Sequence, residues 1–253
     1  MRVLILAAGV GRRLGPLGIE QPKCLLPLGG KTLLARHLEI LDVLDIDSVV
    51  IVVGYRDDMI RAELDTLSTR IRVSTVLNRD YTKGSIVSLW TLRENLVAGG
   101  DVLVMDADVL YGSDVLRRLV TTAKPNCFLL DRDFDPGEEP VKLCVHNGQL
   151  VEFRKQLAED LNITFCGESV GFFRLSEAMA RRLAQRCEEY VDNGRQDEPY
   201  EEAIRDLLLE TPSEFGYEDI TGLPWLEIDF PEDVVRASRD ILSQIENIGL
   251  GSV

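Results

Sequence analysis

The chain has few of the residues that build disulfide frameworks or zinc sites. Its 253 residues include five cysteines and two histidines. The cysteines are scattered without CxxC spacing, and their odd number leaves no complete disulfide set, so we expect reduced thiols and a cytoplasmic protein. Because His37 and His146 are the only histidines, a histidine-rich zinc site is excluded. His37 falls in a helical pattern, and we expect it to be an ordinary helix residue.

The sequence also lacks long apolar runs and low-complexity segments. The longest apolar stretches, 3–8 and 48–53, are far shorter than the ~20 residues that span a bilayer, so we expect neither a transmembrane helix nor a membrane partner. Residues 1–8 superficially resemble a short signal peptide, but they run directly into a Gly-Val-Gly-Arg-Arg turn, which favours a buried first strand. The length and composition predict one globular domain, 1–253.

Positive charge is scarce over most of the chain. There are 28 Lys and Arg residues against 43 Asp and Glu residues, a formal net charge of −15. Such an acidic protein is not expected to bind nucleic acid. The first 36 residues reverse the trend, because they contain six basic residues and a single acid, Glu20. This local excess of positive charge indicates a small anionic ligand near the amino terminus.

The hydrophobic pattern predicts an α/β fold. Short apolar runs alternate with stretches of helical period, which is typical of a mostly parallel sheet covered by helices. We expect strands near 2–7, 48–54, 71–77, 101–106 and 126–131, with helices near 33–44, 57–66, 85–97 and 113–122. The predicted architecture is a three-layer α/β/α, Rossmann-like fold with a mostly parallel mixed sheet.

The pattern changes after Pro140. Two short apolar runs flank an Asn147-Gly148 turn, which is a strong signal for a β-hairpin over 141–153. Beyond it we expect a strand at 169–174, helices at 176–192 and 199–209, a strand at 225–228 and a final helix from 231 to about 246. The second half therefore adds a small region of hairpin and helices to the sheet.

A glycine-rich turn, 6–14, follows the first predicted strand and reads Leu-Ala-Ala-Gly-Val-Gly-Arg-Arg-Leu. Glycines let backbone N–H groups approach phosphate oxygens, and a neighbouring arginine clamps other oxygens. A dinucleotide fingerprint fails because Leu14 stands where its third glycine belongs, and a Walker A loop ending at 30–32 fails because Leu25 replaces its first glycine. From the glycines alone, a triphosphate cradle and a plain tight turn are equal alternatives.

The complete string is more specific. L-A-A-G-x-G-x-R-L at 6–14, P-K-C-L-L-P at 22–27 and G-G-K at 29–31 resemble the amino-terminal signature of the sugar-phosphate nucleotidyltransferase superfamily. Within it, the N-x-x-Y and S-L elements of 78–89 look most like the small CTP:phosphocholine and phosphonate cytidylyltransferases. The resemblance implies an enzyme that transfers CMP from Mg-CTP to a small phosphorylated or phosphonylated acceptor and releases pyrophosphate. Phosphocholine, 2-aminoethylphosphonate, another phosphonate and a polyol phosphate are the acceptors it implies.

The resemblance also implies roles for residues of the nucleotide side. Arg13 is expected to contact the outer phosphates, and Lys23 the reacting phosphoryl group, where a fixed cation stabilises the developing charge. Asp108 and Asp229 are expected to bind Mg²⁺, a cation that prefers oxygen ligands. The residues expected to bind the nucleotide are Leu6, Ala7, Ala8, Gly9, Gly11, Asn78, Gly84, Ser85 and Asp106. For Ser85, capping of the helix that begins there is an equal alternative.

On the acceptor side, the resemblance implies that Lys142 or Lys155 holds the phosphate or phosphonate, while Glu168 and Glu201 face an alcohol or amine end. Each of these has an ordinary surface-charge alternative. The domain is accordingly divided into a nucleotide-binding part, 1–135, and a part, 136–253, that binds the acceptor and supplies the second metal ligand. Whether the protein is a monomer or a homodimer stays open.

Two other functions stay open. A sugar-1-phosphate nucleotidyltransferase using UTP, dTTP or GTP is disfavoured because no left-handed β-helix repeat follows the Glu-Ile-Asp segment at 227–229. A catalytically inactive nucleotide-binding regulator is disfavoured because the cations and carboxylates of the motif are all present. The sequence departs from the family pattern at 106–108, where Asp-Ala-Asp replaces a residue followed by Gly-Asp.

Overall fold

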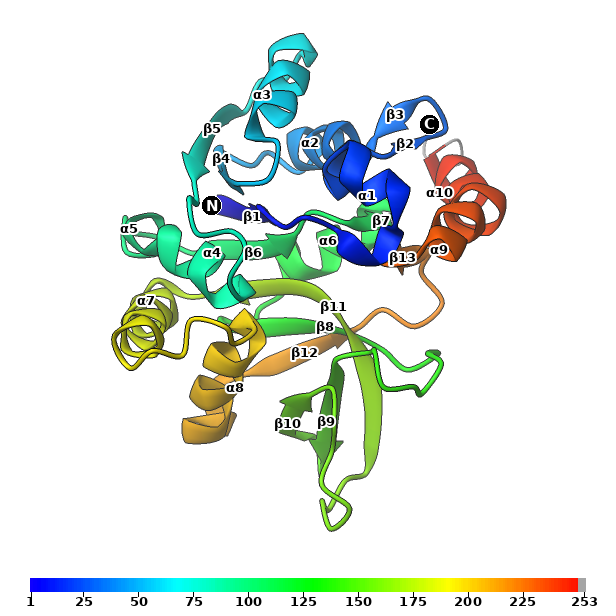
Figure 1. Ribbon diagram of the computed structural model, residues 1–253. Coiled ribbons are helices and arrows are strands. Elements are labelled where there is room, and N and C mark those ends of the chain that lie inside the picture. Colours follow the sequence, from blue (N-terminus) through cyan, green and yellow to red (C-terminus); the bar gives the residue numbers. More distant parts are fainter. Residues whose placement is uncertain (250–253) are drawn as a thin grey trace.

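A computed structural model describes residues 1–249. Its centre is a nine-stranded sheet in which the order β10-β9-β11-β6-β1-β4-β5 runs across the molecule, with β8 paired to β11 and β12 paired to β8 (Figure 1). The strands are β1 Arg2–Ala7, β4 Ser48–Val53, β5 Arg72–Leu77, β6 Val102–Asp106, β8 Cys127–Asp131, β9 Lys142–His146, β10 Gln149–Arg154, β11 Phe165–Leu175 and β12 Gly216–Asp219. Strands β6, β1, β4 and β5 are parallel, whereas β11 is antiparallel to β6, β8 and β9.

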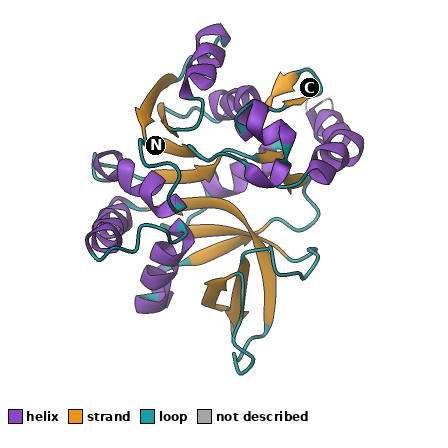
Figure 2. Ribbon diagram, viewed as in Figure 1, coloured by secondary structure: helices purple, strands orange, loops and turns teal. Residues whose placement is uncertain are grey.

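Helices cover both faces of the sheet, which confirms the predicted layered α/β architecture (Figure 2). They are α1 Pro16–Glu20, α2 Leu33–Val43, α3 Asp57–Thr66, α4 Ser85–Thr91, α5 Arg93–Leu96, α6 Ser113–Thr121, α7 Glu177–Asp192, α8 Tyr200–Glu210, α9 Pro231–Arg236 and α10 Leu242–Gly249. No helix within residues 1–249 is long and apolar enough to cross a membrane.

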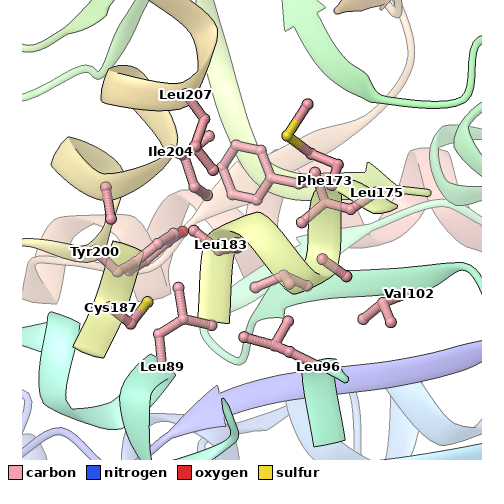
Figure 3. Packing of buried hydrophobic residues seen from close by; sticks show 14 of the residues in the cluster. Leu89, Leu96, Val102, Phe173, Leu175, Leu183, Cys187, Tyr200, Ile204 and Leu207 are labelled. Atoms are coloured by element: carbon pink, nitrogen blue, oxygen red, sulfur yellow. The ribbon is translucent and has the colours of Figure 1, made fainter. Parts of the chain in front are cut away.

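Strand β1 shows how the sequence builds two cores. Alternate side chains of a strand point to opposite faces of its sheet. Val3 and Ile5 pack with α2, α3 and α6 on one face, whereas Leu4 packs with α4, α5, α7 and α8 on the other. In the second core, Phe173 of β11 lies against Leu183 of α7 and its neighbours (Figure 3). A strand covered on both faces reads as a continuous apolar run, as β1 does.

Two predicted helices are interrupted. The predicted helix 85–97 is wrong in its continuity, because Leu92 leaves helical geometry and its N–H turns back to the carbonyls of Leu89 and Trp90. The predicted helix from 231 is likewise divided by a π-helical turn, Ala237–Ile241. Strand β11 also begins at Phe165 rather than 169, since 165–168 pair with β9.

Several elements of two to five residues were not predicted, because such short segments carry no readable period. They are the 3₁₀ turns Arg12–Leu14, Lys23–Leu25 and Pro212–Glu214, helix α1, strand β12, the hairpin of β2 Pro27–Leu28 with β3 Lys31–Thr32, and strand β7 Val109–Tyr111. Strand β7 pairs antiparallel with β13, Trp225–Glu227. Strand β13 was predicted, but no partner strand was predicted for it. This small ribbon brings segments that are distant in the sequence to one place.

Candidate active site

A cavity of about 440 Å³ opens at the carboxyl ends of β1 and β6. The chain leaves β1 toward β4 on one side and returns through β6 on the other, so the cavity lies where the strand order reverses, the usual ligand site of open α/β sheets. The predicted site residues that line it are Leu6, Ala7, Ala8, Gly9, Gly11, Arg13, Lys23, Ser85, Asp106, Asp108, Glu201 and Asp229.

The glycine loop, which we define as residues 8–14, passes beside Lys23. Gly11 has a φ of 65°, and a Cβ built there would lie 2.9 Å from Cγ of Lys23. By contrast, nothing lies within 4 Å of a Cβ built on Gly9. Glycine at position 11 thus allows the backbone to turn in the left-handed region while the lysine stem packs against it.

The ammonium group of Lys23 joins two carboxylates. Its Nζ lies 2.9 Å from Oδ2 of Asp108 and 2.6 Å from Oδ1 of Asp229. Burial lowers the pKa of Lys23, but the charges and hydrogen bonds of the two aspartates outweigh it, and the pKa lies above its usual value. Because the Lys23 and Asp229 side chains are only 14% and 13% exposed, water screens this pairing weakly.

Arg13 is held by carboxylates as well. Its Nη2 lies 3.0 Å from Oδ2 of Asp229, and its Nη1 lies 2.5 Å from Oε2 of Glu139. The guanidinium also lies over the ring of Phe230, 5.4 Å from the centroid. Both predicted phosphate-binding cations therefore meet at Asp229.

Three carboxylates form what we call the carboxylate cluster: Asp108, Glu227 and Asp229 each offer one oxygen, all within 4.8 Å of one another. Backbone pairing assembles it, since Ile228 N donates to the carbonyl of Asp108 at 2.9 Å and Glu227 pairs with Val109. Burial, with Asp108 and Asp229, raises the pKa of Glu227 to about 8. Three hard oxygen donors fit a Mg²⁺ ion, which keeps its remaining positions for water and phosphate.

Glu227 is a residue of this cluster that the prediction of the metal ligands missed. The signal was present, because residues two apart in an extended segment point to the same side, and Glu227 and Asp229 are so spaced. What the sequence could not show is the partner strand that places Glu227 beside Asp108.

Asp106 lies deeper in the cavity. Its Oδ2 accepts a hydrogen bond of 2.7 Å from the hydroxyl of Tyr200, and it closely approaches Gly171, whose built Cβ would lie 2.3 Å away. Burial, Asp108 and Glu201 together raise the pKa of Asp106 well above its usual value. At neutral pH this carboxyl therefore holds a proton more readily than an exposed aspartate does.

Asn78 and Gly84, predicted to bind the nucleotide, do not line the cavity in the described structure. The Asn78 amide donates to Oγ of Ser88 at 3.1 Å, and its oxygen accepts from the N–H of Asp80 at 2.9 Å. A Cβ on Gly84 would lie 2.3 Å from the carbonyl oxygen of Glu198. Both residues shape the segment 78–88, from which Tyr81, Thr82 and Lys83 line the cavity instead.

Ser85 does not cap its own helix, so that alternative is wrong. Gly84 precedes α4 and no side chain caps it there. Instead, Oγ of Ser85 accepts a hydrogen bond of 2.9 Å from the N–H of Tyr200, the first residue of α8. An N–H in the first turn of a helix has no partner within that helix, and Ser85 supplies one from outside. The serine thereby links the two sides of the cavity.

Of the predicted acceptor residues, only Glu201 lines the cavity. Its Oε2 is buried and has no hydrogen-bond partner among the described residues, and burial raises its pKa. Lys142, Lys155 and Glu168 lie outside the lining. Nζ of Lys142 donates to the carbonyls of Gly137 and Lys155, at 2.7 and 2.8 Å, so backbone oxygens already occupy it.

Glu168 is a half-buried carboxyl outside the cavity. It pairs across the sheet with Asp131, whose carboxylate accepts from Nε1 of Trp225 at 2.7 Å. Burial and Asp131 raise the pKa of Glu168 to about 7. Lys155 lies nearby, and its Nζ is 3.4 Å from the Glu139 carboxylate that also contacts Arg13.

An open α/β sheet with a glycine loop, two cations and clustered carboxylates at its switch point is the arrangement of an enzyme that handles nucleotide phosphates. Comparison with known families agrees, since residues 3–169 match the MobA-like NTP transferase domain, and the chain belongs to this family. It is a nucleotidyltransferase.

The chain is also similar to curated relatives and to solved structures. The chain is 28% identical over 242 residues to CMP-5'-(3-aminopropyl)phosphonate synthase of Streptomyces rubellomurinus, covering 94% of this chain but only 38% of that longer protein. It is 24% identical over 253 residues to CTP:phosphoglutamine cytidylyltransferase of Campylobacter jejuni, covering 92% of this chain and 98% of the relative. The inositol-1-phosphate CTP transferase of T. maritima shares the fold, with a TM-score of 0.76, 21% identity and coverage of 97% and 96%.

Replacing Lys23 by Met tests the cation at the centre of the site. The variant keeps an unbranched stem beside Gly11 but lacks the ammonium group. We expect turnover to fall by ~100-fold or more, because a fixed positive charge is lost where charge develops. We also expect the metal-free protein to melt at a lower temperature, and Mg²⁺ to raise that temperature more than in the wild type, because no ammonium group competes for the carboxylates.

Turnover and thermal unfolding with and without Mg²⁺ measure both effects. Lys31→Met is the matched control, because Lys31 is half-exposed and pairs with Glu39 at the surface. Wild-type turnover in the Lys23 variant would show that this ammonium has no part in the reaction.

Replacing Glu168 by Gln tests its raised pKa. A carboxyl with a pKa near 7 when folded and near 4.5 when unfolded contributes stability below pH 4.5 that is lost as the pH rises to 7. Gln carries no charge at any pH, so we expect the variant to match the wild type at pH 4 and to exceed it by about 1–3 kcal/mol at pH 8. Urea unfolding at the two pH values measures this difference. Exposed Glu159→Gln is the control, and equal stabilities of the Glu168 variant and the wild type at pH 8 would disprove the shift.

Proposed function

We propose that the protein is a cytidylyltransferase that transfers CMP from Mg-CTP to a small phosphorylated or phosphonylated acceptor and releases pyrophosphate. The observation that carries the proposal is the position of Lys23, whose stem packs against Gly11 of the glycine loop and whose ammonium group bonds to two members of the carboxylate cluster. A cation in this place faces both a metal-bound phosphate and the backbone that receives a nucleotide. In this proposal residues 1–135 hold CTP, while 136–253 hold the acceptor and contribute Glu227 and Asp229.

The chemistry needs no protein nucleophile. An oxygen of the acceptor's phosphate or phosphonate attacks the α-phosphorus of CTP, and the bond to the pyrophosphate oxygen breaks. Lys23 stabilises the charge that grows on the nonbridging oxygens, and Arg13 binds the outer phosphates. Mg²⁺, when held by the carboxylate cluster, neutralises phosphate oxygens as a Lewis acid. The glycine loop and the start of α4 orient the nucleotide, so positioning and electrostatics supply most of the rate.

CTP is supported by the two relatives, because their names describe CMP or CTP chemistry. The segment beside the glycine loop adds to this support. Tyr81, Thr82, Ser85 and Ser88 line that side of the cavity and offer hydroxyl groups. A hydroxyl both donates and accepts, so it can pair with the amino group and the carbonyl of cytosine.

An acceptor with an amino group fits the other side of the cavity. Within residues 1–249, Glu201 has a buried carboxylate oxygen without a hydrogen-bond partner, and the carboxyl of Asp106 accepts a hydrogen bond from Tyr200, the residue before it. Burying a charged oxygen without a partner is costly, and an ammonium group of the acceptor would remove that cost. The acceptors named for the two relatives, an aminopropylphosphonate and a phosphoglutamine, both carry amino groups.

Pyrophosphate release with Mg²⁺ tests the class of reaction. We expect turnover with CTP and an amino-bearing phosphonate or phosphate in a panel of 2-aminoethylphosphonate, other phosphonates, phosphocholine, inositol phosphate and glucose 1-phosphate. Each of the four ribonucleoside triphosphates and dTTP is tried with each acceptor, with EDTA as the control. Turnover with a hexose phosphate and UTP, dTTP or GTP alone would instead place the protein among the sugar nucleotidyltransferases. Binding of CTP without any turnover would favour a regulator.

Replacing Glu201 by Gln tests the acceptor side by itself. We expect kcat/KM for the amino-bearing acceptor to fall ~10-fold or more, about 1.4 kcal/mol, because the charge that faces the ammonium group is gone. The KM for CTP should not change. An acceptor without an amino group, such as inositol phosphate, is the internal control, and an equal loss with both acceptors would contradict recognition of the amino group.

A further inference from the structure

His37 of α2 is buried directly beneath the acid loop, which we define as residues 106–108. It is fully inaccessible to solvent. Its Nε2 lies 3.2 Å from the carbonyl oxygen of Ala107, and its Nδ1 lies 3.1 Å from the hydroxyl of Tyr111. Since Ala107 stands between Asp106 and Asp108, the ring contacts the backbone that carries both carboxylates.

The chemistry of the two partners fixes the proton on the ring. A carbonyl oxygen can only accept, so Nε2 must carry the hydrogen that it shares with Ala107. Burial lowers the pKa of His37 to about 4, and a neutral ring has one N–H. Nδ1 therefore accepts, and the hydroxyl of Tyr111 donates to it. The ring centroids of His37 and Tyr111 are 5.3 Å apart, and Phe172 packs against both rings.

The acid loop is held at two consecutive carbonyls. His37 donates to the carbonyl of Ala107, and Ile228 N donates to the carbonyl of Asp108 at 2.9 Å. The first bond comes from α2, and the second from the segment that carries Glu227 and Asp229. Two bonds from different elements restrict rotation of the peptide that sets the direction of the Asp108 side chain. An apolar side chain at position 37 would fill the space but would leave the Ala107 carbonyl without this donor.

We propose that His37 is a positioning residue, whose Nε2–H holds the Ala107 carbonyl so that Asp108 stays within the carboxylate cluster. The catalytic consequence rests on the proposed function, but the hydrogen bond and its effect on metal binding do not. Groups that orient metal ligands without touching the metal typically change affinity by ~10- to 100-fold when removed. Displacing a reacting group by about 1 Å costs a similar factor in rate.

The tautomer is tested by nitrogen NMR of the full chain labelled at histidine. The sequence contains only two histidines, so a His146→Ala variant assigns the signals. We expect His37 to carry its proton on Nε2 at pH 7.5, with Nδ1 unprotonated. A proton on Nδ1 alone would overturn the proposal, because Nε2 could then not donate to the carbonyl of Ala107.

Two amide variants separate positioning from packing. In His37→Gln the side-chain NH₂ falls near the place of Nε2 and can still donate to Ala107, whereas in His37→Asn it falls near Nδ1 and cannot reach that carbonyl. We expect His37→Asn without nucleotide to bind Mn²⁺ ~10- to 100-fold more weakly than the wild type, as measured by electron paramagnetic resonance, with His37→Gln close to the wild type. Tyr111→Phe, which keeps the bond to Ala107, should also stay close to the wild type.

The outcomes distinguish the two proposals. Equal Mn²⁺ affinity in the Asn and Gln variants, even with a lower melting temperature, would mean that His37 only packs. The proposal would also fail if the wild type itself bound no Mn²⁺, because His37 would then have no metal ligand to position. If the Asn variant binds Mn²⁺ weakly but the wild type turns over no nucleotide with any acceptor, the proposed function fails while the role of His37 stands. A parallel rise in the Mg²⁺ concentration for half-maximal turnover supports both.

Discussion

The contact of one ammonium group with two carboxylates determines how the site is built. Asp108 lies between β6 and β7, and Asp229 follows β13. Without a cation their charges, together with that of Glu227, would oppose the folding that brings them together. Lys23 removes this opposition, because its Nζ bonds to both aspartates. The same charges suit a divalent cation, so the ammonium group keeps the cluster assembled in a form that a metal can enter.

The carboxylate cluster also depends on backbone pairing in the ribbon of β7 and β13. Glu227 pairs with Val109, and the next N–H, that of Ile228, bonds to the carbonyl of Asp108. This register places Asp108, just before β7, beside Glu227 and Asp229 at the end of β13. A shift of one residue would turn Glu227 and Asp229 to the opposite side. The buried ring of His37, on α2, bonds to the carbonyl of Ala107. A helix as well as the ribbon therefore contributes to the geometry of the cluster.

The nucleotide side and the acceptor side are joined at the starts of two helices. Ser85, at the start of α4, accepts from the first N–H of α8, and the N–H groups of Gly84 and Ile86 donate to the carbonyls of Gln196 and Glu198. The hydroxyl of Tyr200 then reaches Asp106 at the end of β6. These hydrogen bonds tie the start of α4 to the start of α8 and, through Tyr200, to the end of β6.

The sequence by itself determined the α/β class, most strands and helices, and the glycine-rich turn, because these follow from local period and contiguous motifs. The candidate roles of Lys23 and Asp108 came from the resemblance of those motifs to a known family. Only the tertiary structure decided that Glu227 joins Asp108 and that Ser85 serves a different helix. It alone placed Lys142 and Glu168 outside the cavity lining. The reason is physical: short strands carry no period, and whether a polar side chain faces a cavity or a backbone carbonyl depends on elements distant in the chain.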